Sequence, residues 1–169
     1  IGNTYEDVLS SLQKGISGIS LNETYADMGF RSQISGSINI HFADLIDRKL
    51  LRFMGEASAY SYLAAQDAIK MSGLAEDDLD SPRVGIVAGS GGSSTRVMLA
   101  TSDITREKGP KRIGPYAVTK SMASSISAIL GTAFKLKGIN YSISSACATS
   151  AHCIGHAADL IRSGQQDII

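Results

Sequence analysis

The sequence has little of several residue types that mark particular classes of protein. Its 169 residues include no Trp, three Pro and two Cys. Two cysteines are too few for the disulfide framework of a small secreted domain, so we expect free thiols in a reducing, cytoplasmic compartment. No apolar run is long enough to span a bilayer, which predicts a protein without membrane contact.

The sequence also has no excess of basic or of acidic residues. Lys and Arg total 16, Asp and Glu total 16, and the formal net charge is zero. A nucleic-acid-binding domain usually carries a clear basic excess, so we expect no nucleic-acid partner. Recognition by charge must therefore come from local patches.

The second half of the sequence alternates between strand and helix patterns. The apolar run Val84–Val87 predicts a buried strand, and residues 106–116 form a basic turn. Helices are predicted over 119–130 and 148–162, with a strand over 139–145 between them. This alternation with short connections predicts an α/β fold with mainly parallel strands.

The first half has clearer helix ends. A helix is expected from the capping residues Asn3 and Thr4 to a stop at Gly15. A long helix is expected from Asp44 through Met71, with a stop at Gly73. Residues 16–43 read as an extended connection with weak strand signals near 34–40.

The two ends of the sequence suggest a longer protein. The chain opens without Met and closes on Asp167–Ile169, which reads as the start of a buried strand. We expect a fragment of a longer protein. The alternative is a complete small domain with a frayed tail.

Glycines follow the strand at 84–87 directly, as Gly89-Ser90-Gly91-Gly92. A phosphate-binding loop would need a Gly-Lys-Ser/Thr ending, and a dinucleotide fingerprint is only partly matched. Glycines for a tight strand-to-helix turn are the better interpretation. We expect no bound cofactor, and no metal, because the spacing of the two cysteines is not a zinc pattern.

Cys147 is the candidate for chemistry. It stands in SISSACATSAHCIGHA, residues 142–157, where the predicted strand meets the last helix. The positive end of a helix dipole and nearby free N–H groups favour the reactive thiolate, and a sharp strand-to-helix turn presents a side chain outward. The backbone N–H of Cys147 could also help to hold an oxyanion. The alternative is a buried structural cysteine.

A general base for Cys147 is hard to find in the sequence. Cys153 follows six residues later, a helical rise of roughly 9 Å, too far for a disulfide, and is predicted to be packed core. His152 and His156 fall on other faces of the helix, and His41 lies in the weakly structured early segment. Either the base comes from outside this chain or the chemistry is unusual.

Four blocks of the sequence together resemble one family. NYSISSACATSAHCIGHA resembles the active-site segment of the β-ketoacyl-[acyl-carrier-protein] synthases, the condensing enzymes of fatty acid synthesis, and synthase I in particular. The other blocks, in the family's order, are LIDRKLLRFM (45–54), PRVGIVAGSGG (82–92) and IGPYAVTKSMASS (113–125). The resemblance covers nearly the whole chain.

The resemblance implies a thiolase-like α/β fold, layered α-β-α-β-α in the full protein. Residues 1–169 would be most of the N-terminal β-ketoacyl synthase domain, without its first strand and without the whole C-terminal half. Cys147 would accept an acyl group from acyl carrier protein as a thioester. Malonyl-carrier-protein would then lose carbon dioxide, and its carbanion would attack that thioester. Two His and one Lys of the family's second half serve this condensation, so the fragment alone is not expected to complete it.

The resemblance also implies partners. Lys49, Arg52, Lys108 and Lys111 match the basic docking surface for the acidic acyl carrier protein; the alternative is ordinary solvated charges. Met122 matches a residue at a homodimer interface near the acyl pocket of the partner subunit; the alternative is core packing. The rival functions are a non-catalytic chain-length or binding subunit on the same fold, a polyketide ketosynthase, and an unrelated cysteine hydrolase.

Overall fold

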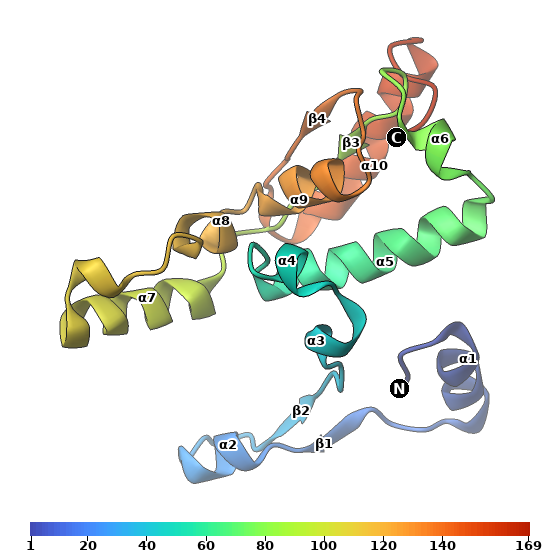
Figure 1. The fold of residues 1–169 in the computed structure, drawn as a ribbon. Helices are drawn as coiled ribbons and strands as arrows, with labels where there is room; N and C mark the ends of the chain where they lie inside the picture. Colours follow the sequence, from blue (N-terminus) through green and yellow to red (C-terminus); the bar gives the residue numbers. More distant parts are fainter. The chain divides into compact units, whose positions relative to one another are not determined.

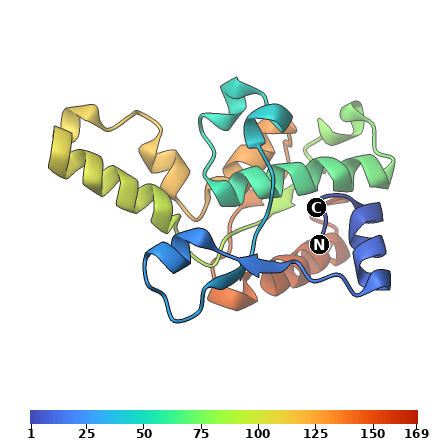
Figure 2. The same ribbon diagram turned by 90° about the horizontal axis from the view of Figure 1, so that it is seen from below.

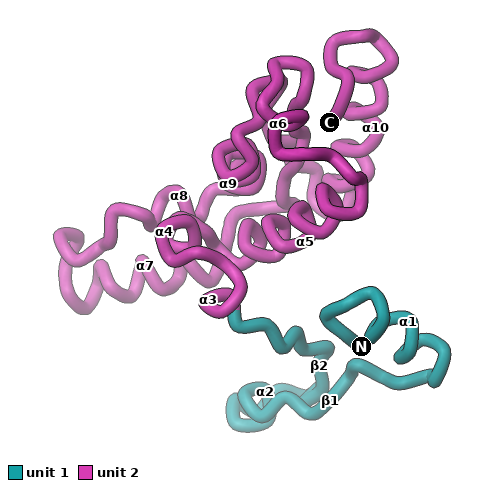
Figure 3. Tube along the Cα trace, turned by 45° about the vertical axis from the view of Figure 1, so that its right-hand side comes forward, with its two compact units in different colours: residues 1–41 teal, residues 42–169 magenta.

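The computed structural model describes residues 1–169, which divide into two compact units, 1–41 and 42–169 (Figure 3). The first unit contains helix α1 (Tyr5–Lys14) and an antiparallel pair of strands, β1 (Ile19–Leu21) and β2 (Ile34–Gly36), joined through helix α2 (Glu23–Asp27). No helix of the chain combines the length and the apolar character needed to cross a membrane.

The ends of α1 confirm the sequence prediction. The Thr4 side chain accepts a hydrogen bond from the backbone N–H of Asp7 at 3.1 Å. Gly15 follows the helix in the left-handed conformation, with φ 65°, which a residue without Cβ adopts at little cost.

The predicted long helix from Asp44 through Met71 is wrong. The segment forms three helices: α3 (Phe42–Leu45), α4 (Arg48–Leu51) and α5 (Glu56–Ser72). Asp47, not Asp44, caps a helix here, by accepting from the Lys49 backbone N–H at 2.7 Å. Gly55 precedes α5, and a Cβ there would lie 2.5 Å from the Lys120 carbonyl oxygen, so the break allows a close backbone approach.

The sheet of the second unit is parallel, as predicted, but its strands are short. Strand β3 (Ile86–Val87) pairs with β4 (Asn140–Tyr141). The last bond between them, from Ala88 N to Tyr141 O, is already 3.4 Å long, and residues 142–145 continue without pairing. On the other edge, Val84 forms a parallel bridge with Ile168, which confirms that the C-terminal residues join the sheet.

The segment between the two strands contains more helix than the sequence predicted. Helix α6 (Glu76–Leu79) precedes β3, and α7 (Thr95–Lys108) takes up the start of the predicted basic turn. A 3-10 turn, η1 (Pro110–Arg112), leads to α8 (Ala117–Ser121) and α9 (Ser125–Ala133). The predicted helix 119–130 is therefore interrupted at Met122, whose backbone is extended. The Ser125 hydroxyl donates to the Thr119 carbonyl across this break.

One face of the sheet packs on the last helix, α10 (Thr149–Arg162). Ile139 and Ile143 pack with Val87 against the buried Cys153 and Leu160 of α10. The helix ends as predicted, with Gly164 at φ 73°. Apolar burial on this face fixes α10 against the strand that leads to Cys147.

The opposite face of the sheet packs on α9. Side chains alternate along a strand, and Asn140 and Ser142 point away from α10. Ser142 and Ser127 of α9 share a hydrogen bond of 2.7 Å, and Asn140 packs against Gly131 of α9. The sheet is thus covered by α9 on one face and α10 on the other.

Helix α5 runs alongside α9 and adds an outer layer (Figures 1 and 2). Ala59 of α5 and Ile129 of α9 belong to one buried cluster with Ile46 and Met54. The second unit therefore stacks α5, α9, the sheet and α10.

Arg83 ties the end of α10 to the start of β3. Its guanidinium donates to both carboxylate oxygens of Asp167 and to the carbonyls of Gly164 and Gln165. The hydrogen bond from Arg83 and its charge lower the pKa of the Asp167 carboxyl. This clamp holds residues 164–168 beside the sheet.

Candidate active site

The structure places Cys147 at the predicted junction and exposes it. It is the middle residue of a 3-10 turn, η2 (Ala146–Ala148), which leads directly into α10. Cys153, one and a half turns further along, is only 7% exposed and packs against Val87 and Leu160, as predicted. The two thiols therefore differ in access: one faces solvent and the other lies in the core.

The turn that carries Cys147 is held by Thr149. The buried Thr149 hydroxyl accepts from the Ser145 N–H at 2.8 Å and donates to the Ala146 carbonyl at 2.9 Å. Ala146 has φ 46°, a left-handed conformation that a residue with Cβ rarely adopts. Such backbone strain costs on the order of 1 kcal/mol and persists only where surrounding contacts enforce it.

Cys147 has a free backbone N–H beside its thiol. The turn's hydrogen bonds run from Ala148 N to Ser145 O and from Thr149 N to Ala146 O, and none uses the N–H of Cys147. A free N–H next to a nucleophile is the arrangement that stabilises a developing oxyanion. The site thus places an exposed thiol beside a backbone N–H that has no hydrogen-bond partner.

The glycine segment after β3 packs directly on this turn. A Cβ at Gly91 would lie 2.8 Å from the Ala146 carbonyl oxygen, and one at Gly89 would overlap the Ile143 carbonyl. Neither glycine has positive φ, and α7 begins only at Thr95. The glycines therefore serve close backbone packing rather than a tight turn into a helix.

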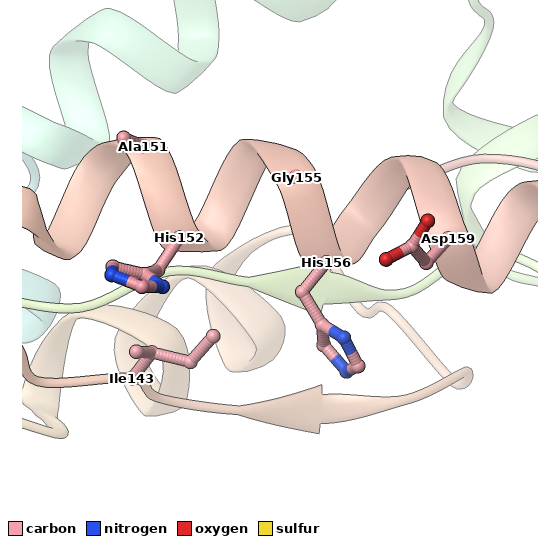
Figure 4. A pocket seen from close by; sticks show the side chains of 6 residues that line it. All are labelled: Ile143, Ala151, His152, Gly155, His156 and Asp159. Carbon is pink, nitrogen blue, oxygen red and sulfur yellow. The ribbon is translucent and has the colours of Figure 1, made fainter.

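The two histidines of α10 lie together, apart from Cys147. They line an open pocket of about 490 Å³ with Asp159, and Figure 4 shows both imidazoles on the side of α10 toward Ile143. The His156 ring also packs on Tyr141, with centroids 5.7 Å apart. Cys147 is not among the residues that line this pocket. No group of three or more His, Cys, Asp or Glu side chains is placed to hold a metal ion.

The four predicted docking residues are all exposed, and none forms an ion pair within the chain. Lys49 lies in α4, and Arg52 ends that helix. Lys108 ends α7, and Lys111 lies in η1, on the other side of Gly109. The fold thus exposes two groups of two basic side chains, and none of the four has an acidic partner in the chain.

Met122 lines an apolar pocket in its own chain, whereas the resemblance implied only that it lies near the acyl pocket of the partner subunit. It is 49% exposed, at the break between α8 and α9, so it is not ordinary core. The pocket measures about 390 Å³ and lies between α4, α8 and α9. Its lining is Leu50, Phe53, Thr119, Met122, Ser124, Ser125, Ala128, Ile129 and Thr132. Small side chains in α9 leave this space open. The abundance of Ser and Ala in α9 was the only signal of the pocket in the residues themselves.

Comparison with known proteins identifies the fold and the family. The model of the family "Beta-ketoacyl synthase, N-terminal domain" matches residues 1–169. The chain belongs to the beta-ketoacyl synthase family. It is 51% identical over 170 residues to 3-oxoacyl-[acyl-carrier-protein] synthase 1 of Haemophilus influenzae and 50% identical over 171 residues to that of Escherichia coli. In both cases the match covers 100% of this chain and 42% of the relative, so the chain spans less than half the length of these curated relatives.

Solved structures confirm the thiolase-like fold of this beta-ketoacyl synthase domain. A beta-ketoacyl synthase from Burkholderia phymatum matches with a TM-score of 0.81 and 22% identity, over 98% of this chain and 41% of that chain. The ishigamide ketosynthase/chain length factor matches with a TM-score of 0.83 and 24% identity, over 98% of this chain and 42% of that chain. A ketosynthase in complex with its type II PKS acyl-carrier protein matches with a TM-score of 0.66 and 25% identity. This match covers 76% of this chain and 37% of that chain.

Proposed function

We propose that this chain is the acyl-accepting part of a 3-oxoacyl-[acyl-carrier-protein] synthase, a condensing acyltransferase of fatty acid synthesis. The observation that carries the proposal is the exposed Cys147 on a strained turn at the start of α10. The identity of about half of all residues to synthase 1 of two bacteria supports the same activity.

The first step is acyl transfer to Cys147. The sulfur attacks the carbonyl carbon of the acyl thioester on the carrier protein. A new carbon–sulfur bond forms to Cys147, the bond to the carrier breaks, and the thiol proton of Cys147 ends on the carrier thiol. The free N–H of Cys147 stabilises the oxyanion of the tetrahedral intermediate.

The second step is condensation. Malonyl-carrier-protein loses carbon dioxide, and the resulting carbanion attacks the acyl carbon on Cys147. The sulfur of Cys147 leaves as a thiolate, which takes up a proton to restore the thiol, and a 3-oxoacyl chain remains on the carrier. Cys147 does not line the pocket of the α10 histidines, and the decarboxylation is assigned to the two His and one Lys that the family carries in its second half. The reaction needs no cofactor.

The carrier docks on the two cation pairs. Acyl carrier protein is acidic, and Lys49, Arg52, Lys108 and Lys111 are exposed without an intramolecular acid to neutralise them. Complementary charge raises the rate of encounter and fixes the orientation of the partner. A related ketosynthase has been solved in complex with an acyl-carrier protein, which supports this partner.

The enzyme works in the cytoplasm as a homodimer. The outer edge of β4 has no neighbouring strand, and an unpaired edge is suited to pairing with a second copy. Met122 is partly exposed, and the apolar pocket that it lines suits an acyl chain. The presence of Cys147 argues against a non-catalytic chain-length subunit.

Product formation by the full-length protein tests this function. With acyl- and malonyl-carrier-protein as substrates, the wild type should form 3-oxoacyl-carrier-protein. Cys147→Ala should abolish the product, and Cys153→Ala should retain it if the variant folds. Product formation by a folded Cys147→Ala variant, at the wild-type rate, would contradict the proposal.

A further inference from the structure

Arg52 differs from the other three docking residues because aromatic rings hold its side chain. Its guanidinium carbon lies 4.9 Å from the centroid of the Phe53 ring and 5.4 Å from that of the Tyr116 ring. The two rings meet edge to face, with centroids 4.8 Å apart. Phe53 follows Arg52 in sequence, whereas Tyr116 directly precedes α8. The arrangement therefore exists only in the folded chain.

The rings restrain the guanidinium but leave its donors available. Arg52 forms no ion pair in the chain, and its side chain is exposed. A guanidinium held over aromatic rings is attracted to them by its charge, and its N–H groups can still donate to a carboxylate, which can accept two of them. Lys49 has no such aromatic neighbour.

We propose that Tyr116 and Phe53 form an aromatic cradle that orients Arg52 to bind a carboxylate of the acidic carrier protein. This inference rests on the docking role given to Arg52 under the proposed function. A long side chain loses rotamer freedom when it binds, and that loss weakens association. The cradle limits the freedom of Arg52 before the carrier arrives, so Tyr116 is a positioning residue for docking.

Tyr116 is the better residue for a test. Phe53 also lines the apolar pocket with Met122, so its removal would alter two features at once. Tyr116 does not line that pocket and contacts Arg52 through its ring. Tyr116→Leu removes the ring, and Tyr116→Phe is the matched control that keeps it.

The experiment is a double-mutant cycle on the full-length enzyme. KM and kcat are measured with acyl-carrier-protein and with a small acyl thioester, for Tyr116→Leu, Tyr116→Phe, Arg52→Ala and the Leu–Ala double variant. Loss of the cation–ring contact should raise the KM for the carrier substrate roughly two- to five-fold in Tyr116→Leu. The values for kcat and for the small thioester should not change. Tyr116→Phe should match the wild type, and Tyr116→Leu should add nothing once Arg52 is Ala.

Each of the following outcomes would contradict the proposed role of the aromatic cradle. An equal effect of Tyr116→Leu with and without Arg52, or an equal loss with the small thioester, would mean that Tyr116 supports only the fold. If Arg52→Ala raises the KM for the carrier substrate and Tyr116→Leu does not, Arg52 has a docking role but Tyr116 does not position it. If Arg52→Ala leaves KM unchanged, the docking assignment itself fails, and the cradle with it.

A second variant covers the case in which Tyr116→Leu does not fold. Arg52→Lys keeps the charge but loses the planar face, so it should also raise the KM for the carrier substrate. A wild-type KM in Arg52→Lys would show that charge alone matters and would overturn the proposal.

Discussion

Cys147 and Cys153 lie six positions apart and have opposite environments. Cys147 is exposed on the turn before α10, and Cys153 is buried among apolar side chains of the sheet and helix. Access alone therefore decides which thiol a reagent meets first. In the native full-length protein, a substoichiometric alkylating reagent should label Cys147 and leave Cys153 free, as read by peptide mass spectrometry. Both should be labelled after denaturation, and preferential labelling of Cys153 in the native protein would contradict the assignment.

Lys49 of α4 and Arg52, which follows this helix, should affect capture of the carrier and not the chemistry. Lys49 and Arg52 are three residues apart, so they lie on one face of the helix. Each exposed charge contributes on the order of 1 kcal/mol, so reversing both to Glu should raise the KM for acyl carrier protein at least several-fold with little change in kcat. The effect should shrink at high salt.

A charge reversal elsewhere provides the control for that prediction. Lys70 is exposed in the last turn of α5 and is outside the predicted docking set. Lys70→Glu should leave KM for the carrier near the wild-type value. Equal loss by the Lys49/Arg52 variant with carrier-bound and carrier-free substrates would show damage to the fold instead, and the docking role would have to be abandoned.

At the scale of elements, the glycine segment after β3 makes close backbone contact with the residues that lead into the Cys147 turn. A Cβ at Gly89 would overlap the Ile143 carbonyl, whereas a Cβ at Gly92 would meet nothing within 4 Å. Gly89→Ala should therefore lower the free energy of unfolding by about 1–3 kcal/mol and slow acylation of Cys147, because the backbone must move. Gly92→Ala should change stability by less than about 0.5 kcal/mol. Denaturant unfolding and acylation rates of the two variants measure this.

An equal effect of the two substitutions would contradict the packing role of Gly89. Loss of stability in both would point to a general intolerance of Cβ atoms in the segment. No loss in either would show that the backbone of 143–146 can shift without consequence.

The sequence predicted helix ends well where the signal is local. Thr4, Gly15 and Gly73 end helices through their own caps or left-handed conformations, and the parallel strand order followed from alternation. The breaks in the predicted helices were missed because contacts beyond the i to i+4 spacing of a helix accompany them, together with the local cap Asp47. Gly55 allows close approach to the Lys120 carbonyl, and Ser125 bonds the Thr119 carbonyl. The hydrophobic periodicity of a helix contains no information on such partners.

The candidate site was predictable to a similar extent. The junction position of Cys147 followed from strand and helix patterns, and its exposure and the burial of Cys153 agree with that reading. The apolar pocket beside Met122 and the rings around Arg52 were not predictable. Phe53 and Tyr116 are far apart in sequence, and only the fold brings them together.

At the scale of the whole molecule, we expect a homodimer. The free edge of β4 and the exposed Met122 are features that a second copy would cover. The full-length protein should therefore have twice the mass of one chain by light scattering at micromolar concentration. Met122→Glu, which places a charge on this surface, should weaken the dimer. A monomer under these conditions would contradict the expected assembly.

The central claim is that Cys147 accepts an acyl group, and direct mapping of the acyl-enzyme tests it. The full-length protein is incubated with acyl-carrier-protein in the absence of malonyl-carrier-protein, quenched in acid and digested for tandem mass spectrometry. The account predicts one acyl group per chain, on Cys147, with the peptide fragments excluding Cys153 and no adduct in Cys147→Ala. An acyl group on Cys153, or a folded protein that carries none while it still forms product, would contradict it.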